Sequence, residues 1–403
     1  MSGFTTNVYL VTVPDDFVPS RIKSTDPLHE PWQLTAEQRE VFRKRSRESR
    51  TAREMALAGL GGAPLHEVNV SRFDPLDLMP RRESNGLTTL SLFSGGGGLD
   101  LGFERAGFSH GGSWEILEDA ARTLVAARPN WHVHGGADGD VRGVDWRKFR
   151  GDVQVIHGGP PCQPFSNAGK QRGAADPRDM WPEFVRAVLE ARPEAFVAEN
   201  VAALATSTFT DYVAETIMAP LGKHYEIRRV ILQAYEFGVP QVRRRVFFFG
   251  FQSKAAAYRF VPSAGKFRRP GSEDDGRAEA WGVRDALGLS DIGFDDVAPT
   301  IRSGLSGPRN TTSILSSVSA QRRFAALQVW PNGVAASREN ASAFVAKNGH
   351  FRLAVPDVGL LQGFPESWQF VGATYMRLGQ IGNSVVPPVA YAVGSSVADA
   401  LLT

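Results

Sequence analysis

From residue 87 onward, the chain alternates short apolar runs with amphipathic stretches. The runs that predict strands are LTTLSLF (87–93), SWEIL (113–117), DVQVIHGG (152–159), EAFVAENV (194–201), YEIRRVILQA (225–234) and RRRVFFFGF (243–251). Between them, EDAARTLVAARP (118–129) and WPEFVRAVLEARP (181–193) carry apolar residues at helical spacing. Strands that alternate with helices predict an α/β fold, in which helices cover both faces of a mixed, mostly parallel sheet.

The remaining pattern divides the chain into four parts. Residues 1–86 form an N-terminal extension that lacks the alternation, and residues 87–250 form the α/β domain. Residues 251–345 are rich in Gly, Ser, Arg, Asp and Pro with little periodicity, which predicts an irregular inserted domain. Residues 346–403 return to apolar helical patterns and rejoin the α/β domain.

The extension contains one stretch of helix formers, residues 34–62. Thr35 and Gln38 have the spacing of a capping box, and Gly61 provides a stop signal. We interpret the stretch as a solvated helix with salt-bridged faces. An arm that contacts phosphates is the alternative, because residues 43–50 are rich in Arg and Lys.

Composition narrows the class of protein. The 403 residues are 42% hydrophobic and 22% charged, as in ordinary globular proteins, and the start of the chain does not resemble a signal peptide. No apolar run is long enough to cross a bilayer, so we expect no membrane association. A single cysteine, Cys162, excludes an intramolecular disulfide and a multi-cysteine zinc site, and we expect no bound metal.

The turn after the first strand, Phe93–Gly98, is rich in glycine. Glycines there permit positive φ angles and a close approach of the backbone to a ligand, without matching the G-x-G-x-x-G dinucleotide pattern. Glu115 ends the next strand. In nucleoside-cofactor sites, a carboxylate at this position accepts hydrogen bonds from the ribose hydroxyls. Considered without the other motifs, Glu115 is interpreted as a solvated carboxylate at the end of a strand.

A second turn holds Cys162, in the stretch HGGPPCQPFSNAGKQRG (157–173), whose glycines and prolines rule out a core helix or a central strand. The thiol follows a strand end, where it can be exposed and polarised. Glu199 ends the next strand and should face the same cleft. Gln241, Arg243 and Arg245 alternate in sequence, which predicts that they share one face of a strand.

These residues strongly resemble the cytosine-5 DNA methyltransferases, in particular bacterial type II modification methylases. LSLFSGGGGLDLGFERAGF is similar to their cofactor-binding motif, GGPPCQPFSNAGKQRG to their Pro-Cys-Gln motif, ENV to Glu-Asn-Val and QVRRR to Gln-x-Arg-x-Arg. LLQGFP and GQIGNSVVPP resemble the ninth and tenth motifs, and all six follow the family's order. Asp357 departs from the ninth motif, because the arginine that often precedes the acidic residue is missing.

The resemblance implies a Rossmann-like S-adenosyl-L-methionine-dependent methyltransferase, with residues 251–345 as the target-recognition domain. It implies a DNA (cytosine-5-)-methyltransferase that flips a cytosine out of a specific duplex sequence. Cys162 would add to carbon 6 of the base, and Glu199 would contact N3 and the exocyclic amine. Arg245 would hold the base oxygen, while Arg243 and Gln241 would support Arg245 or the catalytic loop.

The resemblance also implies the binding residues. Glu115 would bind the ribose, Ile116 the adenine ring and Asp140 the adenine amine. The full set expected for S-adenosyl-L-methionine is Phe93, Gly95, Gly97, Gly98, Glu115, Ile116, Asp140, Met180, Asn383 and Ser384. Residues expected to contact double-stranded DNA are Lys170 and Arg172 in a closing loop and Arg302, Arg309, Asn310 and Thr311 in the target-recognition domain.

Two other functions compete with this interpretation. A transfer-RNA cytosine-5 methyltransferase of the same fold would carry a Cys-Phe-Thr motif, which a chain with one cysteine lacks. A catalytically silent DNA-binding relative would not be expected to keep Cys162, Glu199 and Arg245. We expect a cytoplasmic, nucleoid-associated monomer of a prokaryotic restriction–modification system, with a cognate endonuclease encoded nearby and no stable complex with it. An orphan or phage enzyme is the alternative setting.

Overall fold

The computed structural model describes residues 66–161, 179–303, 312–315, 317–342 and 349–402, together with residues scattered between 36 and 58. Most of the scattered residues are helical, and Arg47 pairs with Glu40 at 2.8 Å on an exposed face. Both observations agree with a solvated, salt-bridged helix. Six expected site residues lie outside the described part of the chain: Cys162, Lys170, Arg172, Arg309, Asn310 and Thr311.

A seven-stranded sheet has the order β3-β2-β1-β4-β5-β7-β6. Its strands are β1 (Thr88–Leu92), β2 (Ser109–Glu115), β3 (Val133–Gly135), β4 (Val155–Gly158), β5 (Ala195–Val201), β6 (Glu226–Gln233) and β7 (Arg244–Phe251). Only β7 runs antiparallel to its neighbours in this sheet. The predicted fold class, a mixed and mostly parallel sheet with helices, is confirmed.

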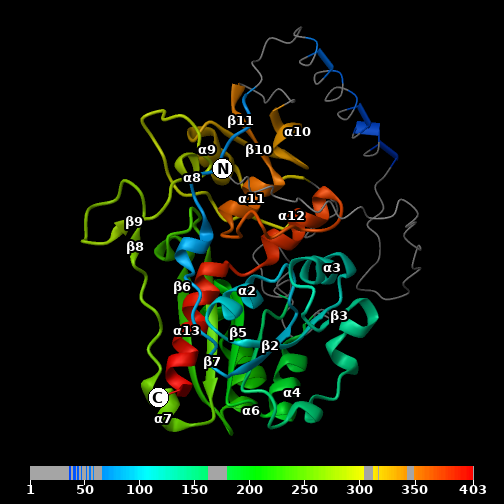
Figure 1. Ribbon diagram of the computed structural model, residues 1–403, viewed down its shortest axis with the longest axis vertical. Coiled ribbons are helices and arrows are strands. Elements are labelled where there is room, and N and C mark those ends of the chain that lie inside the picture. The colour runs from blue at the N-terminus through cyan, green and yellow to red at the C-terminus, as the bar shows by residue number, and fades with distance from the viewer. Residues whose placement is uncertain are drawn as a thin grey trace, which may run out of the picture. The chain divides into compact units, whose positions relative to one another are not determined.

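Both faces of the sheet are buried, and strand β7 shows why. Phe247, Phe249 and Phe251 point into one hydrophobic core, whereas Val246 and Phe248 point into the other, as the two-residue period of a strand requires. Helices α2, α7 and α13 contribute to the first core, and α4 to the second (Figure 1). The apolar run of β7 is therefore continuous because no side of the strand meets water.

Helices α3, α4, α12 and α13 follow the predicted patterns, whereas α7 packs on the sheet although the sequence assigned residues 251–345 to an irregular inserted domain. Those of the α/β part are α2 (Gly98–Arg105), α3 (Glu118–Ala127), α4 (Trp181–Ala191), α7 (Lys254–Arg259), α12 (Thr374–Asn383) and α13 (Pro387–Leu402), with short turns α5 (Thr210–Tyr212) and α6 (Ala219–Leu221). By length and composition, the stretch Thr374–Leu402 could cross a membrane, but 67% of its most apolar window is buried in the fold. It comprises α12 and α13, and α13 packs against α2 as a core helix.

The inserted region has a small hydrophobic core of its own. Its elements are β8 (Phe267–Arg268), β9 (Ala278–Glu279), α8 (Val283–Ala286), α9 (Val318–Ala326), β10 (Val329–Ala335) and α10 (Arg338–Ser342). Strand β10 pairs in parallel with β11 (Phe351–Ala354), which leads into α11 (Val355–Leu361). The core joins side chains of α8, α9 and β10 to side chains of α11 and α12, so the inserted region packs on the C-terminal return.

Residues 66–86 also pack on the fold, although the sequence assigned them to an extension. Phe73 is 3% exposed and lies in the core of the inserted region. Met79 is fully buried in a separate cluster with Leu101 of α2 and Leu124 of α3. The part of the extension next to the α/β domain therefore contributes side chains to two cores.

Candidate active site

The glycine-rich turn, the start of the Cys162 stretch and Glu199 emerge at one edge of the sheet. Strands β1, β4 and β5 are parallel neighbours, with Leu92 opposite Gly158 and Gly158 opposite Ala198. Their carboxyl ends therefore meet, and ligands of such sheets bind at that edge.

Glu199 and Arg245 form a buried ion pair at this edge. The Glu199 side chain is 9% exposed, and its Oε1 lies 2.9 Å from Nε of Arg245 on the neighbouring strand β7. Burial raises the pKa of Glu199, while the charges of Arg245 and Arg243 oppose the rise. A raised pKa favours the protonated carboxyl group, which is the form that can donate to a ring nitrogen.

The backbone that leads to Cys162 is held beside Glu199. Asn200 donates from Nδ2 to the carbonyl oxygen of Pro160 at 3.1 Å, within the buried part of the site. A Cβ atom on Gly159 would lie 3.3 Å from Oε2 of Glu199, so glycine leaves room beside the carboxylate. Cys162 follows Pro161 directly in the sequence, which ties the thiol to this end of β4.

Gln241 and Arg243 do not lie on the strand that carries Arg245. That prediction is wrong, because β7 begins at Arg244 while Gln241 and Val242 pair with Ala298 of the inserted region. Both side chains are buried, and they bind backbone of three distant segments. Gln241 donates to the Leu361 carbonyl and accepts from the Ile301 amide; Arg243 donates to the carbonyls of Ile301, Gly382 and Ser384.

Gln362 completes this cluster and was missed in the sequence. Its amide nitrogen donates to the Ser384 carbonyl at 2.7 Å, and its oxygen accepts from Gln241 at 2.8 Å. A polar residue between the apolar Leu361 and Phe364 was the available signal, because a buried amide needs partners. Gln241, Arg243 and Gln362 together join the inserted region to the turn after α12.

The glycine-rich turn has two kinds of glycine. Phe93 and Gly95 have φ angles of 56° and 55°, and a Cβ on Gly95 would meet only the Phe93 carbonyl, at 3.9 Å. By contrast, a Cβ on Gly97 would lie 2.6 Å from Trp368, and one on Gly98 would lie 1.9 Å from the Val385 carbonyl. Gly95 thus leaves the backbone open to a ligand, whereas Gly97 and Gly98 permit close packing on the C-terminal return.

Glu115 and Ile116 fit a nucleoside cofactor. The Glu115 carboxylate is buried, and its two oxygens accept the amide protons of Gly95 at 2.6 Å and Leu117 at 2.7 Å. Each oxygen keeps a lone pair that can accept a ribose hydroxyl. Burial raises the pKa of Glu115, and these two backbone hydrogen bonds oppose the rise. The apolar Ile116 side chain beside it is 40% exposed and offers a surface for a flat ring.

The other expected cofactor residues occupy different environments. Asp140 accepts from the Arg142 amide and side chain, which lowers the pKa of Asp140. Met180 precedes α4 and packs on the second core. Asn383 is exposed at the end of α12, whereas Ser384 is buried and its Oγ donates to the Gln380 carbonyl at 2.8 Å. A Cβ on Gly96 would lie 2.6 Å from Ser384 Oγ, so this serine adjoins the glycine-rich turn.

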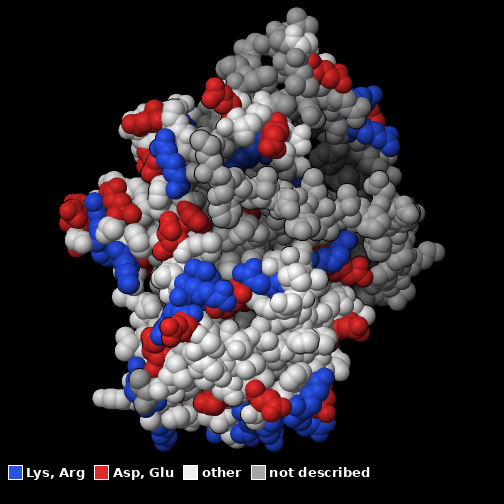
Figure 2. Space-filling view, in the orientation of Figure 1, with Lys and Arg blue, Asp and Glu red and all other residues white. Residues whose placement is uncertain are grey.

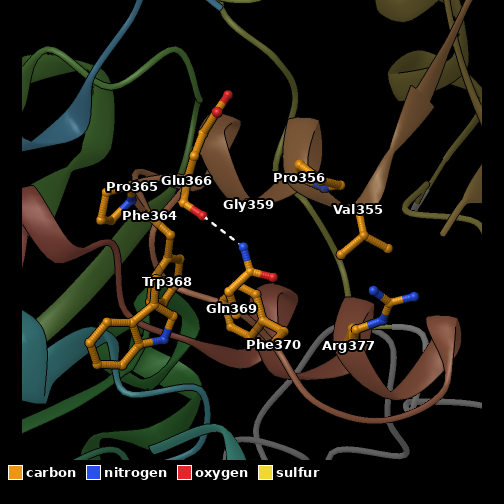
Figure 3. Close-up of a pocket in the computed structure, with 10 residues that line it drawn as sticks. All are labelled: Val355, Pro356, Gly359, Phe364, Pro365, Glu366, Trp368, Gln369, Phe370 and Arg377. Atoms are coloured by element: carbon orange, nitrogen blue, oxygen red, sulfur yellow. Dashed lines mark hydrogen bonds between the residues drawn. The ribbon is translucent and has the colours of Figure 1, made fainter. Parts of the chain in front are cut away.

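A hollow beside the glycine-rich turn contains a guanidinium group that the sequence did not single out. It is lined by α11, α12 and the loop between them, with Phe364, Trp368 and Phe370 on one side and Arg377 on the other (Figure 3). Trp368 donates from its indole nitrogen to the Gly96 carbonyl at 3.0 Å. Arg377 makes only long contacts, to Ala336 at 3.4 Å and Thr374 at 3.5 Å, and forms no ion pair with the described residues.

A family model and two related proteins match most of this chain. A family model described as C-5 cytosine-specific DNA methylase matches residues 87–285 and 310–399. The chain is 33% identical over 319 residues to the type II methyltransferase M.NgoMIV of Neisseria gonorrhoeae, covering 78% of this chain and 98% of that protein. It is also 33% identical over 326 residues to the type II methyltransferase M.NaeI of Lentzea aerocolonigenes, covering 78% and 75% respectively.

Solved structures show the same fold at lower identity. DNMT2 of Spodoptera frugiperda, in a mutant form, matches with a TM-score of 0.53 and 16% identity, covering 77% of this chain and 99% of that chain. The Dnmt2 methyltransferase of S. pombe matches with a TM-score of 0.51 and 18% identity, covering 77% and 98%.

Proposed function

This chain belongs to the C-5 cytosine-specific DNA methylase family and is a DNA cytosine-5 methyltransferase that uses S-adenosyl-L-methionine, and we propose that Cys162, Glu199 and Arg245 carry the reaction. The observation that supports this assignment is the buried Glu199–Arg245 pair beside the backbone of Gly159 and Pro160. It brings an acid, a cation and the approach to the only thiol to one edge of the sheet.

The thiol makes carbon 5 of cytosine reactive. In the proposed sequence, the Cys162 thiolate adds to carbon 6 of the flipped base, and the electron pair of the 5,6 double bond moves toward carbon 5. Bound S-adenosyl-L-methionine supplies an electrophilic methyl group on its sulfonium sulfur. After carbon 5 has taken the methyl group, a base or water removes the carbon 5 proton. The Cys162–carbon 6 bond then breaks, and the double bond and the thiolate are restored.

Glu199 and Arg245 stabilise the negative charge that the addition of the thiolate places on the base. Glu199 donates a proton toward N3 as negative charge builds on the ring, and burial favours the proton-bearing form of Glu199 by raising its pKa. The Arg245 guanidinium, 18% exposed, stabilises negative charge on the base oxygen. Gln241 and Arg243 act behind this pair, because the hydrogen bonds of their side chains join backbone segments around it.

The cofactor is assigned to the pocket between the glycine-rich turn and Glu115. Glu115 accepts the ribose hydroxyls, Ile116 lies against the adenine ring, and Asp140 accepts from the adenine amine. Phe93, Gly95 and Met180 line the turn. Gly97 and Gly98 pack closely on the C-terminal return, where Asn383 and Ser384 complete the proposed cofactor set.

Duplex DNA is the substrate, and we assign part of its contact surface to guanidinium groups without carboxylate partners. Arg302 and Arg377 form no ion pair with the described residues, so their charge is available to phosphates or base edges. Figure 2 shows Lys and Arg side chains gathered in a band across the middle of the face drawn. Lys170, Arg172, Arg309, Asn310 and Thr311 complete the proposed set and lie outside the described residues.

The biological setting follows from the type II relatives. We place the protein in a restriction–modification system, where it protects host DNA against an endonuclease encoded nearby, as a cytoplasmic monomer that associates with the nucleoid. We propose no stable complex with the endonuclease.

Bisulfite sequencing tests the function directly. DNA from a host that expresses the chain should show protected cytosines in one short motif, and DNA from a host that expresses Cys162→Ser should show none. Transfer RNA from both hosts is sequenced in parallel. Protected cytosines in transfer RNA with none in DNA would overturn the proposal.

A further inference from the structure

The segment of residues 66–79, which we name the strap, lies outside the family match that begins at residue 87. It reaches the inserted region at Phe73, whose amide and that of Arg72 bind the Ala286 carbonyl of α8 at 3.4 and 3.1 Å. It reaches the cofactor side at Met79, in the cluster that includes Trp368. The strap therefore crosses from the DNA-recognition part of the molecule to the part that holds the glycine-rich turn.

A buried carboxylate anchors the strap. Asp357 of α11 is fully buried, and its Oδ1 accepts from Asn69 Nδ2 at 3.0 Å and from Arg338 Nε at 2.8 Å. Its Oδ2 accepts from the Ala354 amide at 2.8 Å. Asn69 also donates to the Leu287 carbonyl, next to α8, at 3.1 Å. One carboxylate thus joins the strap, the inserted region and α11.

Arg338 supplies the cation that the ninth motif lacks. The residue before Asp357 is Pro356, and the guanidinium arrives instead from α10, 19 positions earlier in the chain. Arg338 also pairs with Glu366 at 2.6 Å, and Ser71 of the strap donates to the same Glu366 oxygen at 2.7 Å. Figure 3 shows the Glu366 carboxylate turned away from the hollow that its backbone lines.

We propose that the strap positions the target-recognition region against the catalytic domain, so that Asn69 and Ser71 are positioning residues for the choice of DNA sequence. This inference rests on the proposed function. The hydrophobic core that the recognition region shares with the return is non-directional, whereas hydrogen bonds from the strap require a defined orientation. Asn69 and Ser71 bind two carboxylates that share Arg338, and this cluster links α10 of the recognition region to α11 of the return.

The position of the recognition region matters for catalysis because it adjoins the site. A Cβ on Gly382 would lie 2.4 Å from the backbone of both Arg302 and Ser303, one residue before Asn383. A displacement of the recognition region therefore moves Arg302 relative to the flipped base. A misplacement of substrate-positioning groups by about 1 Å can cost about 100-fold in rate, so a displaced Arg302 should weaken the discrimination between DNA sequences.

The test compares Asn69→Ala and Ser71→Ala with Asn85→Ala in the full-length chain. Asn85 lies in the same extension, but the described partners of its side chain are the Ala106 carbonyl and the Leu87 amide, on the α/β domain. Each variant is assayed for kcat and KM on a duplex with the motif found by bisulfite sequencing and on one with a single changed base pair. Cofactor affinity and melting temperature are measured alongside.

For Asn69→Ala we expect the preference for the cognate duplex to fall about tenfold, with cofactor affinity unchanged. Ser71→Ala should lower the preference for the cognate duplex by less than Asn69→Ala does. Because Ser71 lies at the surface, this variant also tests the inference if Asn69→Ala does not fold. Asn85→Ala should lower the melting temperature without a change in preference. Unchanged preference in both strap variants would overturn the inference, whereas an inactive wild-type chain would overturn the proposed function instead.

Discussion

Asp100 carries a buried carboxyl group whose titration should limit stability at neutral pH. It lies on α2, 2% exposed, above a row formed by Ser113, Ser91 and His157 on neighbouring strands. Ser113 donates to its Oδ1 at 2.9 Å. Burial raises the pKa of Asp100 from 3.8 to about 6, and hydrogen bonds from Ser91 and Ser113 oppose that rise.

The direction of the effect follows from this raised pKa. The folded chain holds the Asp100 proton more tightly than the unfolded chain, so the contribution to stability is full below pH 4 and is lost as pH rises through about 6. A difference of about two pKa units corresponds to about 3 kcal/mol. In Asp100→Asn the amide oxygen still accepts from Ser113 and cannot ionise, so this loss should disappear.

The assay is urea unfolding of wild type and Asp100→Asn at a series of pH values from 4 to 7.5. At pH 4 the variant should be less stable by about 1 kcal/mol, because its buried amide nitrogen lacks an acceptor. Its free energy of unfolding relative to wild type should then rise by about 3 kcal/mol across the series.

Two controls isolate the carboxyl group. His157 is buried and His110 is half-buried, and burial lowers their pKa values to about 3 and about 4; both histidines are present in both proteins. For Asp211→Asn, at an exposed position, the curve of unfolding free energy against pH should run parallel to that of wild type. Parallel curves for wild type and Asp100→Asn would refute the reasoning, since burial would then not control this ionisation.

Three further predictions concern the site. Glu199→Gln should lower the methylation rate at least about 100-fold with unchanged cofactor affinity, measured by single-turnover kinetics, because the amide cannot supply a proton; a smaller loss would remove Glu199 from proton transfer. Gly98→Ala should cost at least about 3 kcal/mol, by urea unfolding, because the Cβ would lie 1.9 Å from a carbonyl, whereas Gly143→Ala, with nothing within 4 Å, should stay within about 0.5 kcal/mol. Arg377→Gln should reduce the slope of log DNA affinity against log salt by about 0.9; an unchanged slope would show that Arg377 contacts no phosphate.

Much of the α/β domain could be predicted because its patterns are local. The apolar run of β7 and the helical spacing of α4 depend on residues at most four positions apart, and strand or helix geometry turns these patterns into buried faces. Glu115 and Glu199 could be placed at one edge because parallel strands share their carboxyl ends. The error at Gln241 and Arg243 arose because tertiary contacts, rather than the period of the sequence, set their environment: Gln241 forms a bridge with Ala298, and the Arg243 side chain binds the backbone of distant segments.

The sequence by itself determined the class of fold and the family, and it supplied the residues that we propose for the chemistry, since each of these depends on short motifs whose order is visible along the chain. Only the tertiary structure decided that Arg338 replaces the missing cation beside Asp357 and that Asn69 reaches a carboxylate 288 positions away. It also decided that position 98 must be glycine, because the Val385 carbonyl packs against it. A buried polar group must be satisfied by whichever segment packs against it. That partner depends on how the layers stack, which no local pattern encodes.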